Sequence, residues 1–149
     1  MQLEWKCKHF DELTAKELYK ILRLRSEVFV VEQNCVYLDI DNKDLESYHL
    51  AGYDGKDLVA YARLLAPGVA FKEASIGRVA THPTFRKTGA GKQLLTQAID
   101  ACLILFPTKE IKIGAQLYLK KFYTDFGFTQ SSELYLEDGI PHIEMILRK

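Results

Sequence analysis

Residues 79–92 read VATHPTFRKTGAGK, and they join an apolar run with strand character to a run with helical spacing. The first N–H groups of a helix have no partner within the helix and carry the positive end of its dipole. Two glycines let a ligand approach the backbone there, and three side chains add positive charge, namely Arg86, Lys87 and Lys92. This junction predicts an anion site suited to phosphate or pyrophosphate.

Two common phosphate-binding motifs do not fit this junction. A P-loop needs a glycine five residues before its Gly-Lys pair and a serine or threonine after it, and here Arg86 and Gln93 occupy those places. A dinucleotide fingerprint needs a third glycine, where this chain has Leu94. These residues alone also fit an alternative without a ligand: an ordinary helix start that contains glycines, with its lysines exposed to solvent.

The remaining chain has the pattern of one α/β unit, and we expect residues 1–149 to form a single domain. A capping box at Thr14 and Glu17 opens a helix, and Asp54-Gly55 predicts a tight hairpin turn. The other helices are expected at 90–106 and 117–126. We expect strands around Leu3, Trp5 and Cys7, and at 48–53, 58–65, 75–81, 110–114, 128–136 and 142–147. This order predicts a mixed sheet with helices on its faces.

Composition excludes several classes of function. The chain has 149 residues with 20 Lys+Arg and 20 Asp+Glu, so no global field steers it to nucleic acid or an anionic membrane. No apolar run approaches the roughly 20 residues that span a bilayer, and the start lacks the apolar stretch of a signal peptide. Its three cysteines, Cys7, Cys35 and Cys102, form neither a disulfide framework nor a zinc pattern. We expect a cytoplasmic protein without a metal site.

Two motifs in the expected order carry a family resemblance. Residues 86–91 fit the [Gln/Arg]-x-x-Gly-x-[Gly/Ala] loop of the GNAT N-acetyltransferase superfamily, which the chain resembles. About 25 residues later, Gln116 stands where that family has an asparagine, and residues 123–128 fit its Tyr-x-x-x-Gly-Phe ending. Over nearly the whole chain the sequence is similar to the ElaA-type subgroup, in residues 23–33, 76–79 and 137–142.

The resemblance implies the GNAT acyl-CoA N-acyltransferase fold: an α/β (α+β) mixed, mostly antiparallel sheet that splays between two parallel central strands, with helices on both faces. It implies transfer of an acetyl group from acetyl-CoA to a primary amine of a small molecule or protein, by direct attack in a ternary complex. The implied coenzyme-binding residues are Val79, Ala80, Thr81, Arg86, Lys87, Thr88, Gly89, Ala90, Gly91, Lys92, Gln116, Phe122 and Tyr123.

Tyr123 has two interpretations. It lies on an apolar helical stripe, where a tyrosine is usually part of the core. The resemblance implies instead that Tyr123 protonates the departing thiolate, which a phenol can do at neutral pH.

The acceptor amine must lose a proton before it attacks, and four side chains are candidate bases. Of these we favour His142, which a turn holds at 138–141, and Glu32; the other two are His49 and Glu73. The acidic group Asp39, Asp41, Asp44 and Glu46 does not fit a calcium loop. We expect it to be a solvated loop or a negative rim that attracts a cationic amine, with Arg78 as a structural partner for one of its acids.

Two other functions remain open. A non-catalytic module could use the same fold to sense acyl-CoA, and a synthase of a signalling lactone could share it. A homodimer is possible. The residues do not identify the acceptor.

Overall fold

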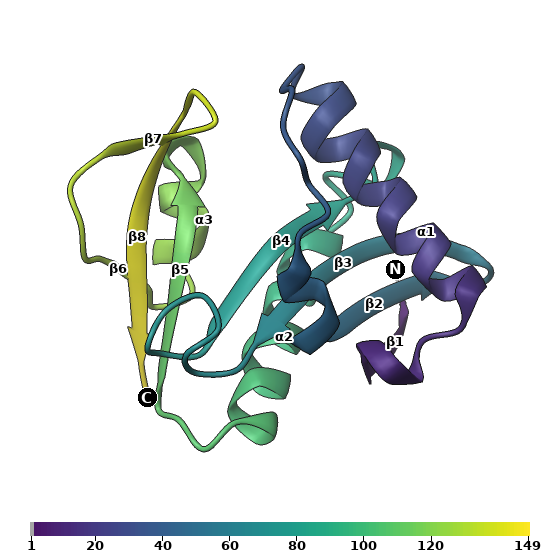
Figure 1. Cartoon of the computed structure of the whole chain (residues 1–149), viewed down its shortest axis with the longest axis horizontal. Helices are drawn as coiled ribbons and strands as arrows, with labels where there is room; N and C mark the ends of the chain where they lie inside the picture. The colour runs from purple at the N-terminus through teal and green to yellow at the C-terminus, as the bar shows by residue number, and fades with distance from the viewer. Residues whose placement is uncertain (1) are drawn as a thin grey trace.

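The computed structural model describes residues 2–149, in which the β-structure forms two four-stranded sheets (Figure 1). The first sheet is antiparallel, in the order β1 (Glu4–His9), β2 (Tyr48–Asp54), β3 (Asp57–Leu65) and β4 (Ser75–Thr81). In the second, β8 (Ile140–Arg148) pairs with β5 (Glu110–Gln116), β6 (Thr129–Gln130) and β7 (Tyr135–Glu137).

The two sheets meet where β4 and β5 lie parallel. Ala74 and Ile111 form a parallel bridge, and the Lys112 N–H donates to the Ala74 carbonyl at 2.9 Å. Beyond this bridge the strands diverge in a V, which Figure 1 shows between the two sheets. The expected mixed sheet, splayed between two parallel strands, is confirmed.

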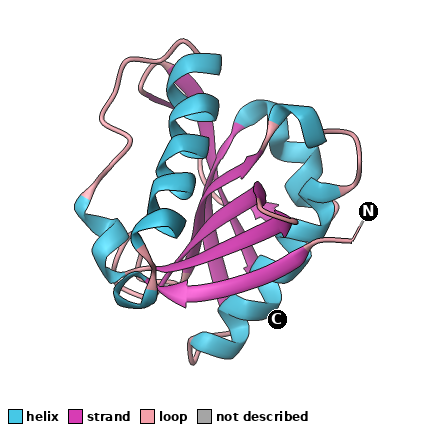
Figure 2. Cartoon of the chain, turned by 90° about the vertical axis from the view of Figure 1, so that its right-hand side faces the viewer, coloured by secondary structure: helices cyan, strands magenta, loops and turns pink. Residues whose placement is uncertain are grey.

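Helices cover both faces of the first sheet (Figure 2). On one face lies α1 (Ala15–Arg25), which the predicted Thr14–Glu17 capping box opens and which continues as a π-helix, η2 (Ser26–Glu32). On the other lies α2 (Ala90–Leu105), whose buried stripe is the predicted one. The short α3 (Lys120–Thr124) packs its Tyr123 into the same apolar cluster as α2 and the strands of both sheets. Short 3-10 turns complete the chain: η1 (Phe10–Glu12), η3 (Asn42–Glu46), η4 (Pro83–Phe85) and η5 (Leu117–Leu119).

A bulge bends β4 beside the V. Tyr61 of β3 pairs with Ala80 and Arg63 pairs with Gly77, so two residues of β4 lie opposite one residue of β3. Arg78, one of the two, has a φ of 51°. Such a bulge bends its strand, and it lies beyond the Ala74–Ile111 bridge, in the part of β4 that diverges from β5.

Three local predictions were wrong in part. The expected strand at 128–136 is two short strands, because the Ser132 hydroxyl replaces a backbone carbonyl and accepts the Glu144 N–H at 2.8 Å. The expected helix at 117–126 is a 3-10 turn followed by the five residues of α3. Cys7 is exposed on the edge strand β1, although its alternation with Trp5 predicted burial.

Candidate functional site

The diverging strands enclose a cleft of about 1130 Å³. Its walls come from β4 and η2 on one side and from β5, β8 and α3 on the other. Most predicted site residues line it: Glu32, Val79, Ala80, Thr81, Arg86, Gly91, Gln116, Phe122, Tyr123 and His142. The others, Lys87, Thr88, Gly89, Ala90 and Lys92, belong to the adjoining loop and the first turn of α2. The structure therefore brings the two sequence motifs together.

The N-terminus of α2 opens beside this cleft. Gly89 caps the helix with a φ of 89° and supplies no side-chain hydrogen bond. The first bond of the helix runs from the Gln93 N–H to the Gly89 carbonyl at 3.1 Å, so the N–H groups of residues 90–92 have no partner within α2. A Cβ at Gly91 would meet Thr81 Oγ1 at 3.8 Å and Phe122 Cζ at 4.0 Å. The absent side chains leave backbone donors accessible to an anion.

One edge of β4 is also available. Within residues 2–149, β4 forms a ladder with β3 alone, and its pairing with the β5 side is confined to the bridge at Ala74. The peptide groups on that edge can pair with an extended ligand as an added strand would.

Tyr123 lines the cleft and is 5% exposed. Its ring packs edge-on against Phe122 and Phe128, with centroids 5.3 Å and 5.9 Å away. Burial raises the pKa of the Tyr123 hydroxyl, because the phenolate would lose its hydration. The side chain is therefore both a core residue and a protonated phenol on the wall of the cleft.

The wall that β8 contributes carries His142, whose ring is largely buried and stacks on Tyr135. His142 Nδ1 lies 2.7 Å from the Ile140 carbonyl. A carbonyl only accepts, so Nδ1 carries the proton and the neutral ring keeps its lone pair on Nε2. The Glu137 carboxylate lies 3.4 Å from Nε2 and can stabilise the ring after it takes a proton.

Glu32 and Arg86, predicted for different roles, form one ion pair. Arg86 Nη2 donates to Glu32 Oε1 at 2.6 Å, and Nη1 donates to Oε2. The hydrogen bonds from Arg86 lower the pKa of Glu32, so the carboxylate stays ionised and is a weak base while paired. The next residue, Gln33, exchanges hydrogen bonds of 3.3 Å and 3.4 Å with Gln116 across the cleft.

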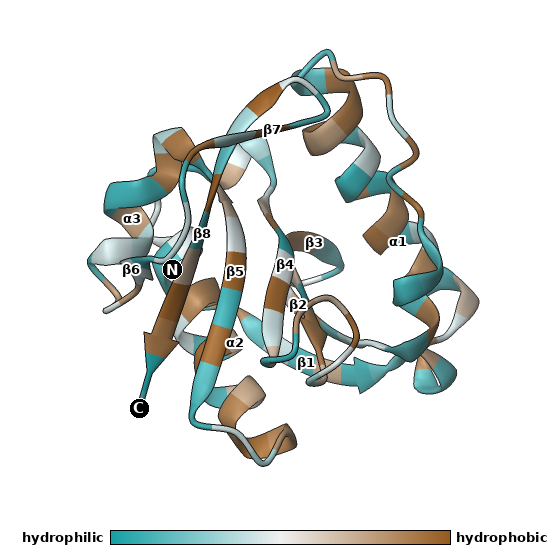
Figure 3. Ribbon diagram, turned by 60° about the vertical axis from the view of Figure 1, so that its left-hand side comes forward, coloured by the Kyte–Doolittle hydropathy of each residue, from teal (hydrophilic) through white to brown (hydrophobic). Residues whose placement is uncertain are grey.

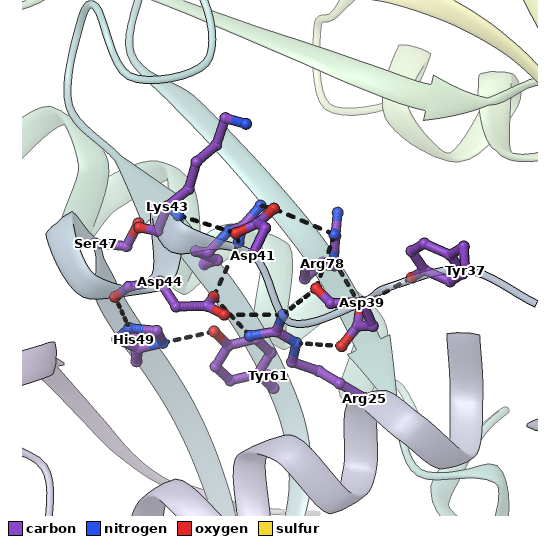
Figure 4. A network of polar contacts seen from close by, with 11 residues as sticks. Arg25, Tyr37, Asp39, Asp41, Lys43, Asp44, Ser47, His49, Tyr61 and Arg78 are labelled. Carbon is purple, nitrogen blue, oxygen red and sulfur yellow. Dashed lines mark hydrogen bonds and ion pairs between the residues drawn. The ribbon is translucent and has the colours of Figure 1, made fainter. Parts of the chain in front are cut away.

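The acidic loop is not the solvated segment that its sequence predicted. Asp39 and Asp44 are 7% and 4% exposed, and both accept hydrogen bonds from the fully buried Arg25 (Figure 4). Arg63 donates to Asp44 at 2.9 Å, and Arg78 donates to Asp39 at 2.7 Å. Arginines on apolar faces of α1 and β3 required acidic partners, a signal in the sequence that could have identified this network. Glu46 alone of the four acids is exposed.

This network ties the loop to the sheet and leaves it without surplus charge. Asp41 pairs with Arg63 at 2.6 Å and with Arg78 at 3.5 Å, so three aspartates face three arginines. A negative rim does not result. The expectation that Arg78 is a structural partner is confirmed, since its bonds to Asp39 hold it in the bulge of β4.

We expect acid to destabilise the protein through this network. Burial alone would raise the pKa of Asp44, but the hydrogen bonds and charges of Arg25 and Arg63 lower it. A carboxyl whose pKa is lower in the folded state stabilises the fold above its unfolded-state pKa, about 3.9, and this contribution is lost as pH falls through the folded-state value. Urea unfolding of Asp44→Asn at pH 7 should show a loss of about 3–5 kcal/mol, because two arginines lose a buried charge. Glu46→Gln, at an exposed position, should leave the free energy of unfolding nearly unchanged. Equal losses of stability in both variants would show that the buried network is not the cause.

The remaining base candidates lie elsewhere. His49 is buried between the Tyr61 hydroxyl, 2.6 Å from Nδ1, and the Asp44 carbonyl, 3.0 Å from Nε2. Burial lowers the pKa of His49, and neither it nor Glu73 lines the cleft.

Within the part of the chain that the structure describes, no group of three or more His, Cys, Asp or Glu side chains is arranged to hold a metal ion. No helix of residues 2–149 has both the length and the apolar character needed to cross a bilayer.

Comparisons with known proteins agree with this architecture. Residues 12–149 match the sequence model of the acetyltransferase (GNAT) domain. ElaA of Escherichia coli is 43% identical over 145 residues, 96% of this chain and 95% of its own. Its crystal structure has a TM-score of 0.92 and covers 99% of this chain and 100% of its own. An acyl-CoA N-acyltransferase from Pseudomonas aeruginosa is 42% identical, with a TM-score of 0.93 over 98% of this chain and 99% of its own. A UPF0039 protein of Synechocystis is 42% identical over 149 residues, 99% of this chain and 97% of its own.

Proposed function

Because the chain belongs to the GNAT acetyltransferase family, we propose that it transfers an acetyl group from acetyl-CoA to a primary amine of a small molecule or protein. The divergence of β4 from β5 beyond the Ala74–Ile111 bridge carries this proposal. It opens a cleft that has a free strand edge on one wall and a helix N-terminus beside it.

The groups around the cleft fit acetyl-CoA. The N–H groups from Lys87 to Lys92 and the Arg86 guanidinium would bind the pyrophosphate, since a helix N-terminus favours an anion. The backbone of β4 from Val79 to Thr81 would pair with the amides of the pantetheine arm. Gln116 and Phe122 line the wall opposite β4. Acetyl-CoA supplies an activated thioester, and the cleft holds it beside the incoming amine, which is mainly catalysis by proximity.

His142 and Tyr123 would transfer the protons. His142 Nε2, the unprotonated nitrogen, takes the proton from the acceptor's ammonium group, and Glu137 stabilises the charged ring. Tyr123 gives its proton to the leaving sulfur; the burial that raises its pKa also makes a thiolate in the cleft more basic. We assign the base to His142 rather than to Glu32, because the carboxylate of Glu32 is paired with Arg86.

His142→Asn is expected to lower kcat/KM about 100-fold, the usual size of a lost general base. Asparagine can still donate to the Ile140 carbonyl but cannot accept a proton. The measurement is kcat/KM with a reactive amine, beside the Kd for acetyl-CoA, which should stay unchanged. A folded variant that keeps the wild-type kcat/KM would exclude His142 as the base.

An acyl-CoA sensor is the second candidate, because a sensor needs the binding groups alone. Release of the coenzyme's thiol across a panel of amines separates the two functions. A protein that binds acetyl-CoA and releases no thiol above hydrolysis with any amine would be a sensor. We place the protein in the cytoplasm, since its three free cysteines suit a reducing compartment.

A further inference from the structure

The last residue of the π-helix η2 and the residue that follows it are hydrogen-bonded to two side chains of the proposed coenzyme site. Glu32 pairs with Arg86, and Gln33 pairs with Gln116. Glu32 and Gln33 are consecutive, and both line the cleft. Figure 3 shows the end of α1 and the β7–β8 turn approaching each other above β4 and β5, where Cys35 Sγ lies 3.5 Å from the Asp138 carbonyl.

We propose that Glu32 is an internal competitor of the coenzyme: its carboxylate occupies Arg86 in the free protein, and the pyrophosphate of acyl-CoA must displace it. This inference rests on the coenzyme site proposed above. It gives Glu32 a role distinct from that of a catalytic base.

The geometry of the pair supports displacement rather than sharing. Both terminal nitrogens of Arg86 donate to Glu32, one to each oxygen, which is the two-pronged arrangement that a guanidinium also makes with phosphate. The remaining nitrogen, Nε, donates to the Thr81 carbonyl at 3.3 Å. The guanidinium is therefore held against the end of β4, and both of its terminal nitrogens are already bonded to Glu32. A pyrophosphate cannot bind these two nitrogens while Glu32 does.

The charges support the same conclusion. Paired with Glu32, Arg86 contributes no net charge to the loop, whereas an unpaired Arg86 would add a full positive charge beside the N-terminus of α2. Both side chains are about 40% exposed, and exposed pairs are weak enough for a doubly charged group to displace them. Displacement also frees the carboxylate of Glu32 on the wall of the cleft, at the moment when a cationic amine must enter.

Calorimetric titration of Glu32→Gln with acetyl-CoA tests this inference. The variant keeps the shape of the side chain and removes its charge, so it should bind about three- to fivefold more tightly than the wild type, the size of one exposed ion pair. Glu110→Gln is the matched control. Glu110 is 45% exposed, pairs with Arg148 at 3.2 Å and does not line the cleft, so its replacement should leave the affinity unchanged.

A double-mutant cycle separates displacement from simple repulsion. In an Arg86→Gln background, Glu32→Gln should no longer increase the affinity for acetyl-CoA, because there is no guanidinium for Glu32 to occupy. Acetyl-pantetheine, a donor without pyrophosphate, should give the same KM with wild type and Glu32→Gln. Unchanged or weaker acetyl-CoA binding by Glu32→Gln would overturn the inference and leave the coenzyme site standing. If the wild type itself does not bind, the proposed function fails, and the inference fails with it.

Discussion

Tyr123→Phe is expected to lower kcat about 100-fold, the usual size of a lost general acid, while the Kd for acetyl-CoA stays unchanged. The substitution removes one oxygen from a ring that Phe122 and Phe128 hold in place. Phenylalanine keeps these contacts, so the cleft retains its shape. The leaving thiolate then has to take its proton from water.

Single-turnover kinetics with acetyl-CoA and a reactive amine measure this effect directly. Tyr118→Phe is the matched control, since Tyr118 also lines the cleft but is 75% exposed and lies outside the buried cluster. A Tyr123→Phe variant that folds and keeps the wild-type kcat would show that Tyr123 is a core residue alone.

Gly89→Glu is expected to weaken acetyl-CoA binding about 100-fold, which corresponds to about 3 kcal/mol. Gly89 has a φ of 89° at the start of α2, a backbone conformation that residues with a side chain rarely adopt. The added carboxylate also places a negative charge beside the site of the pyrophosphate, where like charges a few ångströms apart repel by several kcal/mol.

Gly68→Glu controls for the cost of the substitution itself. Gly68 has a φ of 93°, has no atom within 4 Å of the position of a Cβ, and does not line the cleft. Its replacement therefore carries the same backbone strain and the same charge. Equal weakening in both variants would trace the effect to the fold, and unchanged binding by Gly89→Glu would remove the loop from the coenzyme site.

Most of the fold could be predicted because its signals are local. The capping box at Thr14 and the turn at Asp54-Gly55 act through neighbouring residues, and both appear where the sequence places them. The stripe of α2 follows from helical periodicity alone. The resemblance supplied the splayed arrangement of the strands, which no local pattern encodes.

The errors arose where distant residues decide the outcome. Asp39 and Asp44 have the polar sequence context of a loop, yet Arg25 and Arg63 draw them into the interior. The break between β6 and β7 depends on Ser132, a side chain that competes with the ladder. Periodicity describes which face of an element is apolar, and it cannot show which charge will meet a buried arginine.

The candidate site shows the same division. Both motifs were found in the sequence, and the structure brings them to one cleft. The pairing of Glu32 with Arg86 joins residues 54 positions apart, so nothing in either motif predicts it.

Calorimetric titration of the wild-type protein with acetyl-CoA, on a sample freed of copurified coenzyme, shows whether the cleft between β4 and β5 binds acyl-CoA. We expect saturable one-to-one binding, with the pyrophosphate at the N-terminus of α2. Absence of binding would contradict this expectation, and the glycine-containing loop would then be an ordinary helix entry.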